Sequence, residues 1–333
     1  MLMPSTNWII FILFCLVCCR AFAPCCPNRR SSRHPHSFVS TSADDVSDKG
    51  ISIGFIGCGT IASAIATGIA TQNSVDINSI VVTRRSAAKS TVLQNTFADL
   101  VTISDDNQKI LDQCQYIFLT VLPQQTSSVL QSLTFEPRHS LISLVSTASL
   151  DDLVADSRLE AANVSKMICL PSVARHQGVC LHCFTSHEAS TTPSNALLTR
   201  LFHAMGGVVT LDSESDLQAC MMTTCTMGPL YGMMKYSRDW LLKSTTGLTK
   251  EQASFLVIKQ IVGAVKDADR IEQDGSTSAT DPERLEKMID EQTPGGLNEQ
   301  ALANYERLGG PDGQFQIMDA ILSRIRGQSD GSV

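Results

Sequence analysis

Short apolar runs alternate with longer mixed stretches over the first half of the chain. Four of these runs have the length and the content of branched residues that are typical of buried strands. They lie at 51–56, 79–83, 116–121 and 141–145. Strands separated by helical stretches form a parallel sheet with both faces covered, and such a sheet binds its ligand beyond the carboxyl ends of the strands. The pattern predicts an α/β Rossmann-type dinucleotide-binding domain over 50–210. The loops expected to converge on one crevice are 57–62, 84–86, 120–123 and 146–148.

Beyond about residue 165 the spacing of apolar positions becomes helical. Thr249 and Gln252 have the spacing of a capping box, and Pro229 follows Gly228 as a helix-start signal. We expect an all-α C-terminal domain over 211–327, whose apolar helix faces let two subunits interleave as a homodimer or a larger homo-oligomer. The expected helices cover 211–222, 227–242, 249–271, 282–292, a segment ending at 308, and 313–325.

The glycine-rich turn after the first run has the form of a dinucleotide cradle. Gly57 allows the backbone to turn sharply, and Gly59 lets the phosphates approach the backbone closely. Thr60 and Ile61 then begin a small-residue-rich helix, whose amides and dipole would face the diphosphate. Ordinary turns between a strand and a helix also carry glycines, so the pattern alone leaves that alternative open.

The second run ends in Arg84-Arg85-Ser86, with no acidic residue at this point. A free ribose 2′-hydroxyl is usually held by an acid here, whereas a 2′-phosphate requires guanidinium and hydroxyl donors. The sequence therefore favours NADPH over NADH as the cofactor, with plain surface charge as the alternative. The predicted cofactor site also includes the end of the third run, Val121, Leu122 and Pro123.

Composition and charge agree with a two-domain enzyme. The chain has 333 residues, of which 43% are hydrophobic, and its net charge of -7 argues against a nucleic-acid surface. The first 45 residues differ from the rest, because an apolar run at 8–19 is too short to span a bilayer and a basic, hydroxyl-rich stretch follows it. This combination predicts a signal plus plastid transit peptide over 1–45 and a mature stromal protein without a membrane segment. A secreted protein is the alternative.

The cysteines do not indicate a disulfide framework. Of 12 cysteines, five lie in the leader, which leaves 12 − 5 = 7, an odd and scattered set. Cys180, His182 and Cys183 alternate as residues of a strand do, and their spacing is not that of zinc ligands, so we predict no metal. The cysteines expected in the core or in a pocket are Cys58, Cys169, Cys220 and Cys225.

Several short motifs, taken in their order and spacing, resemble the pyrroline-5-carboxylate reductase family from about Ile51 to Ile325. The resemblance implies a nicotinamide enzyme that reduces a cyclic imine, pyrroline-5-carboxylate, to proline. The cofactor would supply the hydride, and the protein would align it with the imine carbon. The motifs are Gly54-Phe55-Ile56-Gly57-Cys58-Gly59, Phe118-Leu119-Thr120-Val121-Leu122-Pro123-Gln124, Leu170-Pro171-Ser172, Gly228-Pro229-Leu230-Tyr231, Gly263-Ala264-Val265-Lys266 and Thr293-Pro294-Gly295-Gly296.

The resemblance also implies a substrate site at the double-glycine turn. In the family this loop of amides and hydroxyls holds the substrate carboxylate and the imine region. The expected anchor here is the amides of Gly295, Gly296 and Leu297, assisted by Asn298. The family has threonine at the position of Asn298, and asparagine keeps a donor while changing its reach.

Tyr231 and Lys235 are, with Asn298, the candidate catalytic residues. They lie four residues apart on one helical face, so both could reach a pocket. A lysine in a comparable place acts as an acid in β-hydroxyacid dehydrogenases, which makes a keto or hydroxy acid an alternative substrate. A solvated helix lysine is the other interpretation of Lys235.

The substrate half departs from the family pattern more than the cofactor half does. The family's lysine before Pro123 is Leu122, and its asparagine after Pro171 is Ser172. Its serine-glycine-serine before the glycine-proline pair is replaced by residues 225–227. Such a pattern fits a relative with a shifted substrate or a non-catalytic NADPH-binding protein.

Overall fold

The computed structural model describes residues 50–84, 86–271 and 277–333. These residues belong to one compact unit. The predicted leader over 1–45, Arg85 of the predicted cofactor site and part of the polar loop before Pro282 lie outside the described residues.

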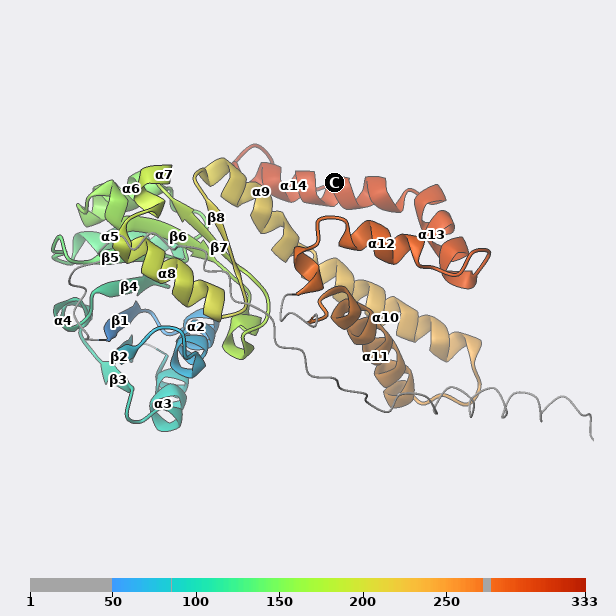
Figure 1. Ribbon diagram of the computed structural model, residues 1–333, viewed down its shortest axis with the longest axis horizontal. Coiled ribbons are helices and arrows are strands. Elements are labelled where there is room, and N and C mark those ends of the chain that lie inside the picture. The colour runs from blue at the N-terminus through green and yellow to red at the C-terminus, as the bar shows by residue number, and fades with distance from the viewer. Residues whose placement is uncertain (1–49, 85, 272–276) are drawn as a thin grey trace, which may run out of the picture. The chain divides into compact units, whose positions relative to one another are not determined.

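The N-terminal part is built on one eight-stranded sheet (Figure 1). Its strands are β1 (Ile51–Ile56), β2 (Ile77–Thr83), β3 (Val101–Ser104), β4 (Tyr116–Leu119), β5 (Ser140–Ser143), β6 (Val164–Ile168), β7 (Cys180–Phe184) and β8 (Val208–Leu211). The strand order is β3-β2-β1-β4-β5-β6-β7-β8, and every neighbouring pair is parallel except β6 with β7. The order reverses between β1 and β4, which is where open α/β sheets bind their ligands.

The expected α/β class is confirmed, and the four expected strands are β1, β2, β4 and β5, each within two residues of its predicted ends. The four expected strands are parallel as predicted, but the change to helical structure beyond about residue 165 was placed too early, because β6, β7 and β8 lie there and β7 is antiparallel to β6. A short 3₁₀ turn, η4 (Pro171–Arg175), joins β6 to β7 without a crossover helix, so the second strand returns antiparallel.

Helices cover both faces of the sheet. They are α2 (Thr60–Thr71), α3 (Ala87–Thr96), α4 (Asn107–Gln113), α5 (Thr126–Gln131), α6 (Leu150–Ser157), α7 (His187–Ser190), α8 (Pro193–Ala204) and α9 (Glu214–Cys225), with 3₁₀ turns η2 (Pro123–Gln125) and η3 (Ala161–Asn163). One core packs α2, α3 and α8 against one face, and a second core packs α4, α5, α6 and α9 against the other. Figure 1 shows this layering, with α8 lying across the strands.

The side chains of strand β7 point alternately into these two cores. Cys180 joins the core with α2 and α8, and His182 packs edge-on against Phe202 of α8, whereas Leu181 and Cys183 join the opposite core. This confirms the strand interpretation of Cys180 and His182. Within the described residues no group of three or more histidine, cysteine or acidic side chains could hold a metal ion.

The seven described cysteines are free thiols. Cys58 and Cys169 are buried as expected, and Cys220 is half-buried. Cys225 is exposed, contrary to expectation, because it is the last residue of α9 and lies beyond the part of that helix that packs on the sheet.

The C-terminal part is helical, with helices α10 (Met227–Ser244), α11 (Lys250–Ala268), α12 (Arg284–Asp290), α13 (Leu297–Arg307) and α14 (Gly310–Ile325), and the 3₁₀ turn η5 (Ser278–Thr280). The predicted capping box is present, since Thr249 accepts from the amide of Gln252 and the side chain of Gln252 accepts from the amide of Thr249. Residues Met318, Ile321 and Leu322 of α14 pack against the core that contains α9. None of the described helices is long and apolar enough to cross a membrane.

Candidate functional site

A cleft of about 670 Å³ opens at the carboxyl ends of β1, β2 and β3. Gly57, Thr83, Arg84 and Val121 line it, together with the start of α4 and one side of α5. Three of the four loops expected to meet therefore contribute to this cleft. The fourth loop, 146–148, does not.

The loop at 146–148 is held outside this cleft by hydrogen bonds from a buried lysine of β6. The Nζ of Lys166 donates to the carbonyl oxygens of Ser146 at 3.2 Å and Ala148 at 2.6 Å. Thr147 and Ala148 instead line a separate cavity of about 300 Å³ together with Pro123. The expected convergence of all four loops on one crevice was wrong, since two cavities share them.

The first glycine of the turn is required by the backbone. Gly57 has a φ of +102°, and a Cβ there would lie 2.7 Å from the carbonyl oxygen of Thr120. Its amide donates to Oγ1 of Thr83 at 2.9 Å, which ties the end of β1 to the end of β2. The sharp turn expected from the sequence is thus held by both neighbouring strands.

The second glycine leaves the ligand side of the turn open. No heavy atom lies within 4 Å of the Cβ position of Gly59. Helix α2 begins at the next residue, Thr60, with no side-chain cap and no acidic residue in its first turn. Uncapped amides at the positive end of a helix dipole fit a diphosphate. These features suit the role predicted for Gly59, Thr60 and Ile61.

Beside Arg84 the cleft contains an acid that the sequence did not indicate. Arg84 Nε donates to Oδ1 of Asp105 at 2.5 Å, and both side chains are largely exposed. Asp105 follows β3, a strand that was not predicted, so no signal placed it beside Arg84. The absence of an acid after β2 is therefore offset by one from the neighbouring strand.

Lys89 is a second group near the turn that sequence reasoning missed. It lies in α3, three residues after Ser86, and its Nζ donates to Oγ1 of Thr60. The positive charge of Lys89 also lowers the pKa of the Cys58 thiol, although burial has the larger effect and raises that pKa overall. Lys89 follows Ser86 by three residues, about one helical turn, and this spacing was a signal in the sequence that could have identified Lys89.

The end of β4 contributes unevenly to the cleft. Val121 is half-buried and lines it, whereas the side chain of Leu122 is 62% exposed. Pro123 begins η2 and faces the second cavity.

The candidate residues Tyr231 and Lys235 lie on α10 and do not join the cleft. Both line a pocket of about 210 Å³ between α10 and α11. Lys235 Nζ donates to Oδ2 of Asp239 at 2.8 Å and lies 5.1 Å from the ring centroid of Tyr236. The bond with Lys235 is the main cause that lowers the pKa of Asp239, to about 2. In this arrangement Lys235 is an exposed, ion-paired helix lysine.

The double-glycine turn forms the N-terminus of α13. Gly295 has a φ of +71°, and its amide donates to Oε2 of Glu299. The amide of Gly296 donates to the carbonyl oxygen of Thr293 at 2.8 Å. Two of the three amides expected to anchor a carboxylate are therefore already bonded. Leu297 and Asn298, the other two members of the expected anchor, are exposed.

Comparison with known proteins shows which proteins the chain resembles. Residues 52–147 match the family model described as NADP oxidoreductase coenzyme F420-dependent. Pyrroline-5-carboxylate reductase 1 of Dictyostelium discoideum is 29% identical over 54% of this chain, and the match spans 33% of that relative's length. The pyrroline-5-carboxylate reductase of Staphylococcus saprophyticus is 26% identical over 76% of this chain and 89% of its own. The chain is therefore similar in sequence to pyrroline-5-carboxylate reductases, and its cofactor half matches a family of NADP oxidoreductases.

A solved structure from this family has the same fold. The pyrroline carboxylate reductase of Plasmodium falciparum, crystallised with NADP bound, has a TM-score of 0.63 and 20% identity, covering 85% of this chain and 98% of that one. The shared fold is a dinucleotide-binding sheet followed by helices. The cleft beside Gly57 thus lies in a nicotinamide dinucleotide-binding fold of the pyrroline-5-carboxylate reductase type.

Proposed function

We propose that the protein is an NADPH-dependent reductase that converts the cyclic imine pyrroline-5-carboxylate to proline. The observation that carries the proposal is the open turn from Gly57 to Thr60 at the sheet's switch point, in a chain that also has the double-glycine turn before α13. The curated relatives described above are named for this reaction.

The proposed reaction requires the protein mainly to bind and orient the cofactor and the substrate. NADPH supplies the hydride when bound, and the protein must hold its diphosphate and orient its ring toward the imine carbon. The amides at the start of α2 and the turn at Gly57 and Gly59 serve the first need. Asn298 and the start of α13 would hold the substrate carboxylate. No nucleophile is required, in keeping with the buried thiol of Cys58, whose pKa is raised by burial.

Turnover of purified protein lacking the leader tests the proposal. Loss of NADPH absorbance on addition of pyrroline-5-carboxylate, with proline as the product, is the expected result. Replacing Asn298→Thr should raise kcat/KM for this imine, because threonine is the residue found in the family. Asn304→Thr, on the same helix but six residues further along the chain, is the matched control. NADPH binding without turnover on any imine or keto acid would contradict the enzyme function.

The bond between Glu299 and the Gly295 amide favours one alternative, a different substrate. A carboxylate of the protein already occupies part of the position where a substrate carboxylate would bind. An imine without a carboxylate, or a keto or hydroxy acid held elsewhere, would avoid that competition. Parallel assays with an unsubstituted cyclic imine distinguish these cases: faster turnover of the unsubstituted imine would favour the alternative. A non-catalytic NADPH-binding role is the remaining possibility and predicts no turnover of either.

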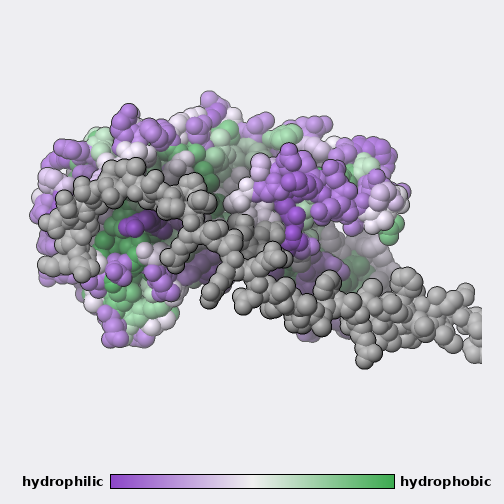
Figure 2. All heavy atoms as spheres, in the orientation of Figure 1, coloured by the Kyte–Doolittle hydropathy of each residue, from purple (hydrophilic) through white to green (hydrophobic). Residues whose placement is uncertain are grey.

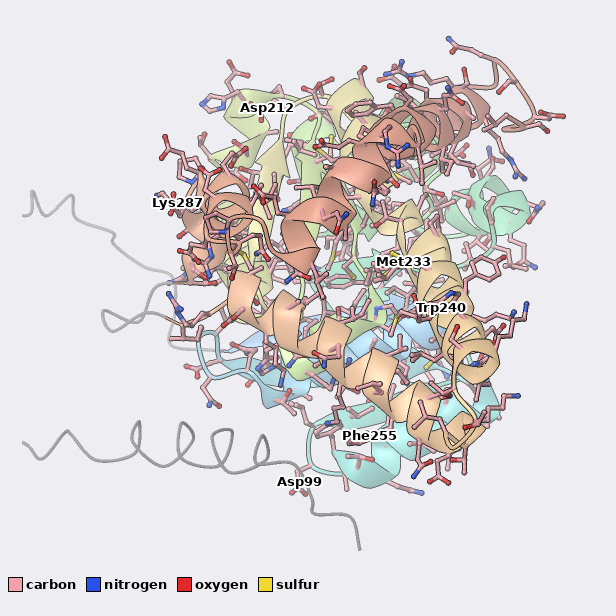
Figure 3. The ribbon with its side chains drawn as sticks, turned by 90° about the vertical axis from the view of Figure 1, so that its right-hand side faces the viewer. Asp99, Asp212, Met233, Trp240, Phe255 and Lys287 are labelled. Carbon is pink, nitrogen blue, oxygen red and sulfur yellow. The ribbon has the colours of Figure 1, made fainter. Side chains whose placement is uncertain are left out.

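We also propose that α10 and α11 bind a second copy of the chain, giving a homodimer or larger homo-oligomer. Large apolar side chains on these helices are exposed, including Met233 at 51%, Trp240 at 65% and Phe255 at 63%. Figure 3 shows these three residues on the two helices. A groove of about 690 Å³ lined by Tyr236, Trp240 and neighbouring residues runs between the helices.

The second copy accounts for this surface because single apolar residues are normal on a monomer but a contiguous apolar face is not. Figure 2 shows, by contrast, a mostly polar visible surface over α12 and α13. Light scattering should give a dimer or more at micromolar concentration, and Trp240→Glu should shift it toward monomer. A wild-type monomer would refute the proposal.

For the leader we propose delivery to the plastid stroma. A fluorescent protein fused behind residues 1–49 should enter plastids, whereas appearance in the medium would favour the secreted alternative.

A further inference from the structure

Lys89 reaches from α3 across to the glycine turn. Its Nζ donates to Oγ1 of Thr60, the first residue of α2, although the two residues are 29 positions apart in the sequence. The influence of Lys89 on the pKa of Cys58 places the same positive charge close to the middle of the turn. The ammonium group therefore lies at the residue after Gly59, whose Cβ position has no heavy atom within 4 Å other than those of Gly59 and its chain neighbours.

This position is unfavourable for a cation unless an anion binds there. The N-terminus of a helix carries a partial positive charge, so a lysine beside it is repelled. The first turn of α2 has no acidic residue, and no carboxylate of the described residues lies within ion-pair distance of Lys89. A phosphate bound beside the lysine would turn this repulsion into attraction.

We propose that Lys89 binds the 2′-phosphate of NADPH and so determines the preference for NADPH over NADH. The inference rests on the proposed NADPH-dependent function. Lys89 follows the turn after β2, which in this fold lies beside the adenosine ribose, whereas the amides of α2 serve the diphosphate. Arg84, one of the residues expected to bind the phosphate, is paired with Asp105, and that carboxylate opposes a 2′-phosphate and suits the free hydroxyl of NADH. Lys89 supplies the positive charge for the phosphate, because Asp105 neutralises the charge of Arg84.

Dissociation constants for NADPH and NADH, measured by fluorescence titration without substrate, test the role of Lys89. In Lys89→Met the Kd for NADPH should rise about tenfold or more, which corresponds to the loss of one charge-assisted contact, while the Kd for NADH stays within about twofold. Lys89→Arg should keep most of the NADPH affinity. Lys109→Met removes one exposed lysine from α4 in the same part of the molecule and should change neither constant.

Three results would overturn the inference. Equal loss of NADPH and NADH binding in Lys89→Met would assign the lysine to the diphosphate, and unchanged binding of both would remove it from the site. A loss in Lys89→Met that Lys89→Gln, the second neutral variant, does not share would also contradict a charge effect. If the wild-type protein binds neither dinucleotide, the proposed function itself fails. Absence of imine turnover, by contrast, leaves this binding test intact.

Discussion

Replacing Lys166 should lower the free energy of unfolding strongly, because its charged side chain is buried and bonded to three parts of the fold. Its side chain is only 2% exposed, and its ammonium donates to Oε1 of Glu214 at 2.7 Å and to the carbonyl oxygens of Ser146 and Ala148. The other carboxylate oxygen of Glu214 accepts from the amide of Leu150 at 2.9 Å. Lys166 thus joins β6, the loop after β5 and the first turn of α9.

The structure gives a magnitude for Lys166→Met. Breaking a buried ion pair from one side costs about 3–5 kcal/mol, since the partner charge stays buried and unpaired. The side chain of Glu214 is 27% exposed, so water can solvate part of its charge, and we expect about 2–4 kcal/mol. At this size, 1 kcal/mol lowers the melting temperature by about 2–4 °C, so the expected loss is about 4–16 °C.

Thermal unfolding followed by circular dichroism provides the measurement. Lys166→Met with Glu214→Gln should be more stable than Lys166→Met alone, because the orphaned charge is gone. Lys287→Met, which removes an exposed lysine paired with Asp281 at 2.8 Å, should leave the transition unchanged. A loss of unfolding free energy below about 1 kcal/mol for Lys166→Met, or simple additivity in the double variant, would refute the conclusion that buried Lys166 stabilises the fold through its three bonds.

The two glycines of the turn should behave differently. Gly57→Ala should destabilise the protein by about 1–3 kcal/mol and weaken NADPH binding, because its φ is +102° and the new Cβ meets Thr120. Gly59→Ala should leave the melting temperature unchanged and weaken only NADPH binding, as measured by titration. The imidazole of His182, whose pKa burial lowers to about 3, should make the fold acid-sensitive. The neutral form stabilises the fold fully above about pH 6.5, the unfolded pKa, and this stability is lost as the pH falls toward 3. Melting temperatures between pH 7 and 5 should fall less steeply in His182→Gln than in the wild type, and parallel slopes would show that another group controls the acid limb.

The sequence predicts the centre of the sheet better than its edges. Strands β1, β2, β4 and β5 lie in the apolar runs predicted from the sequence, and most of their residues are buried. Strand β3 has only four residues with one exposed, and β8 has four residues of which two are exposed, so both give a shorter and weaker pattern. Strand β6 contains Lys166 at a buried position, which looks like a surface residue until its three acceptors are known.

In the candidate site, too, residues of one local unit could be predicted, whereas residues brought together by tertiary contacts could not. Gly57 and Gly59 could be assigned because one continuous strand–turn–helix unit defines their roles. Asp105 could not, because its approach to Arg84 depends on the pairing of β2 with β3. Lys89 reaches Thr60 only through the packing of α3 beside α2, and this tertiary contact leaves a weak trace in the sequence.

The substrate half is harder to predict for a further physical reason. The cofactor turn lies in one local unit, whereas the exposed residues Asn298 and Leu297 begin a helix whose own side chain, Glu299, binds the turn. The Glu299 carboxylate then has two possible roles, a cap that the substrate displaces or a permanent part of a site for a neutral imine. Glu299→Gln separates them: the variant should gain affinity for pyrroline-5-carboxylate over the unsubstituted imine if the carboxylate competes with substrate, and lose activity on both if the acid positions the loop.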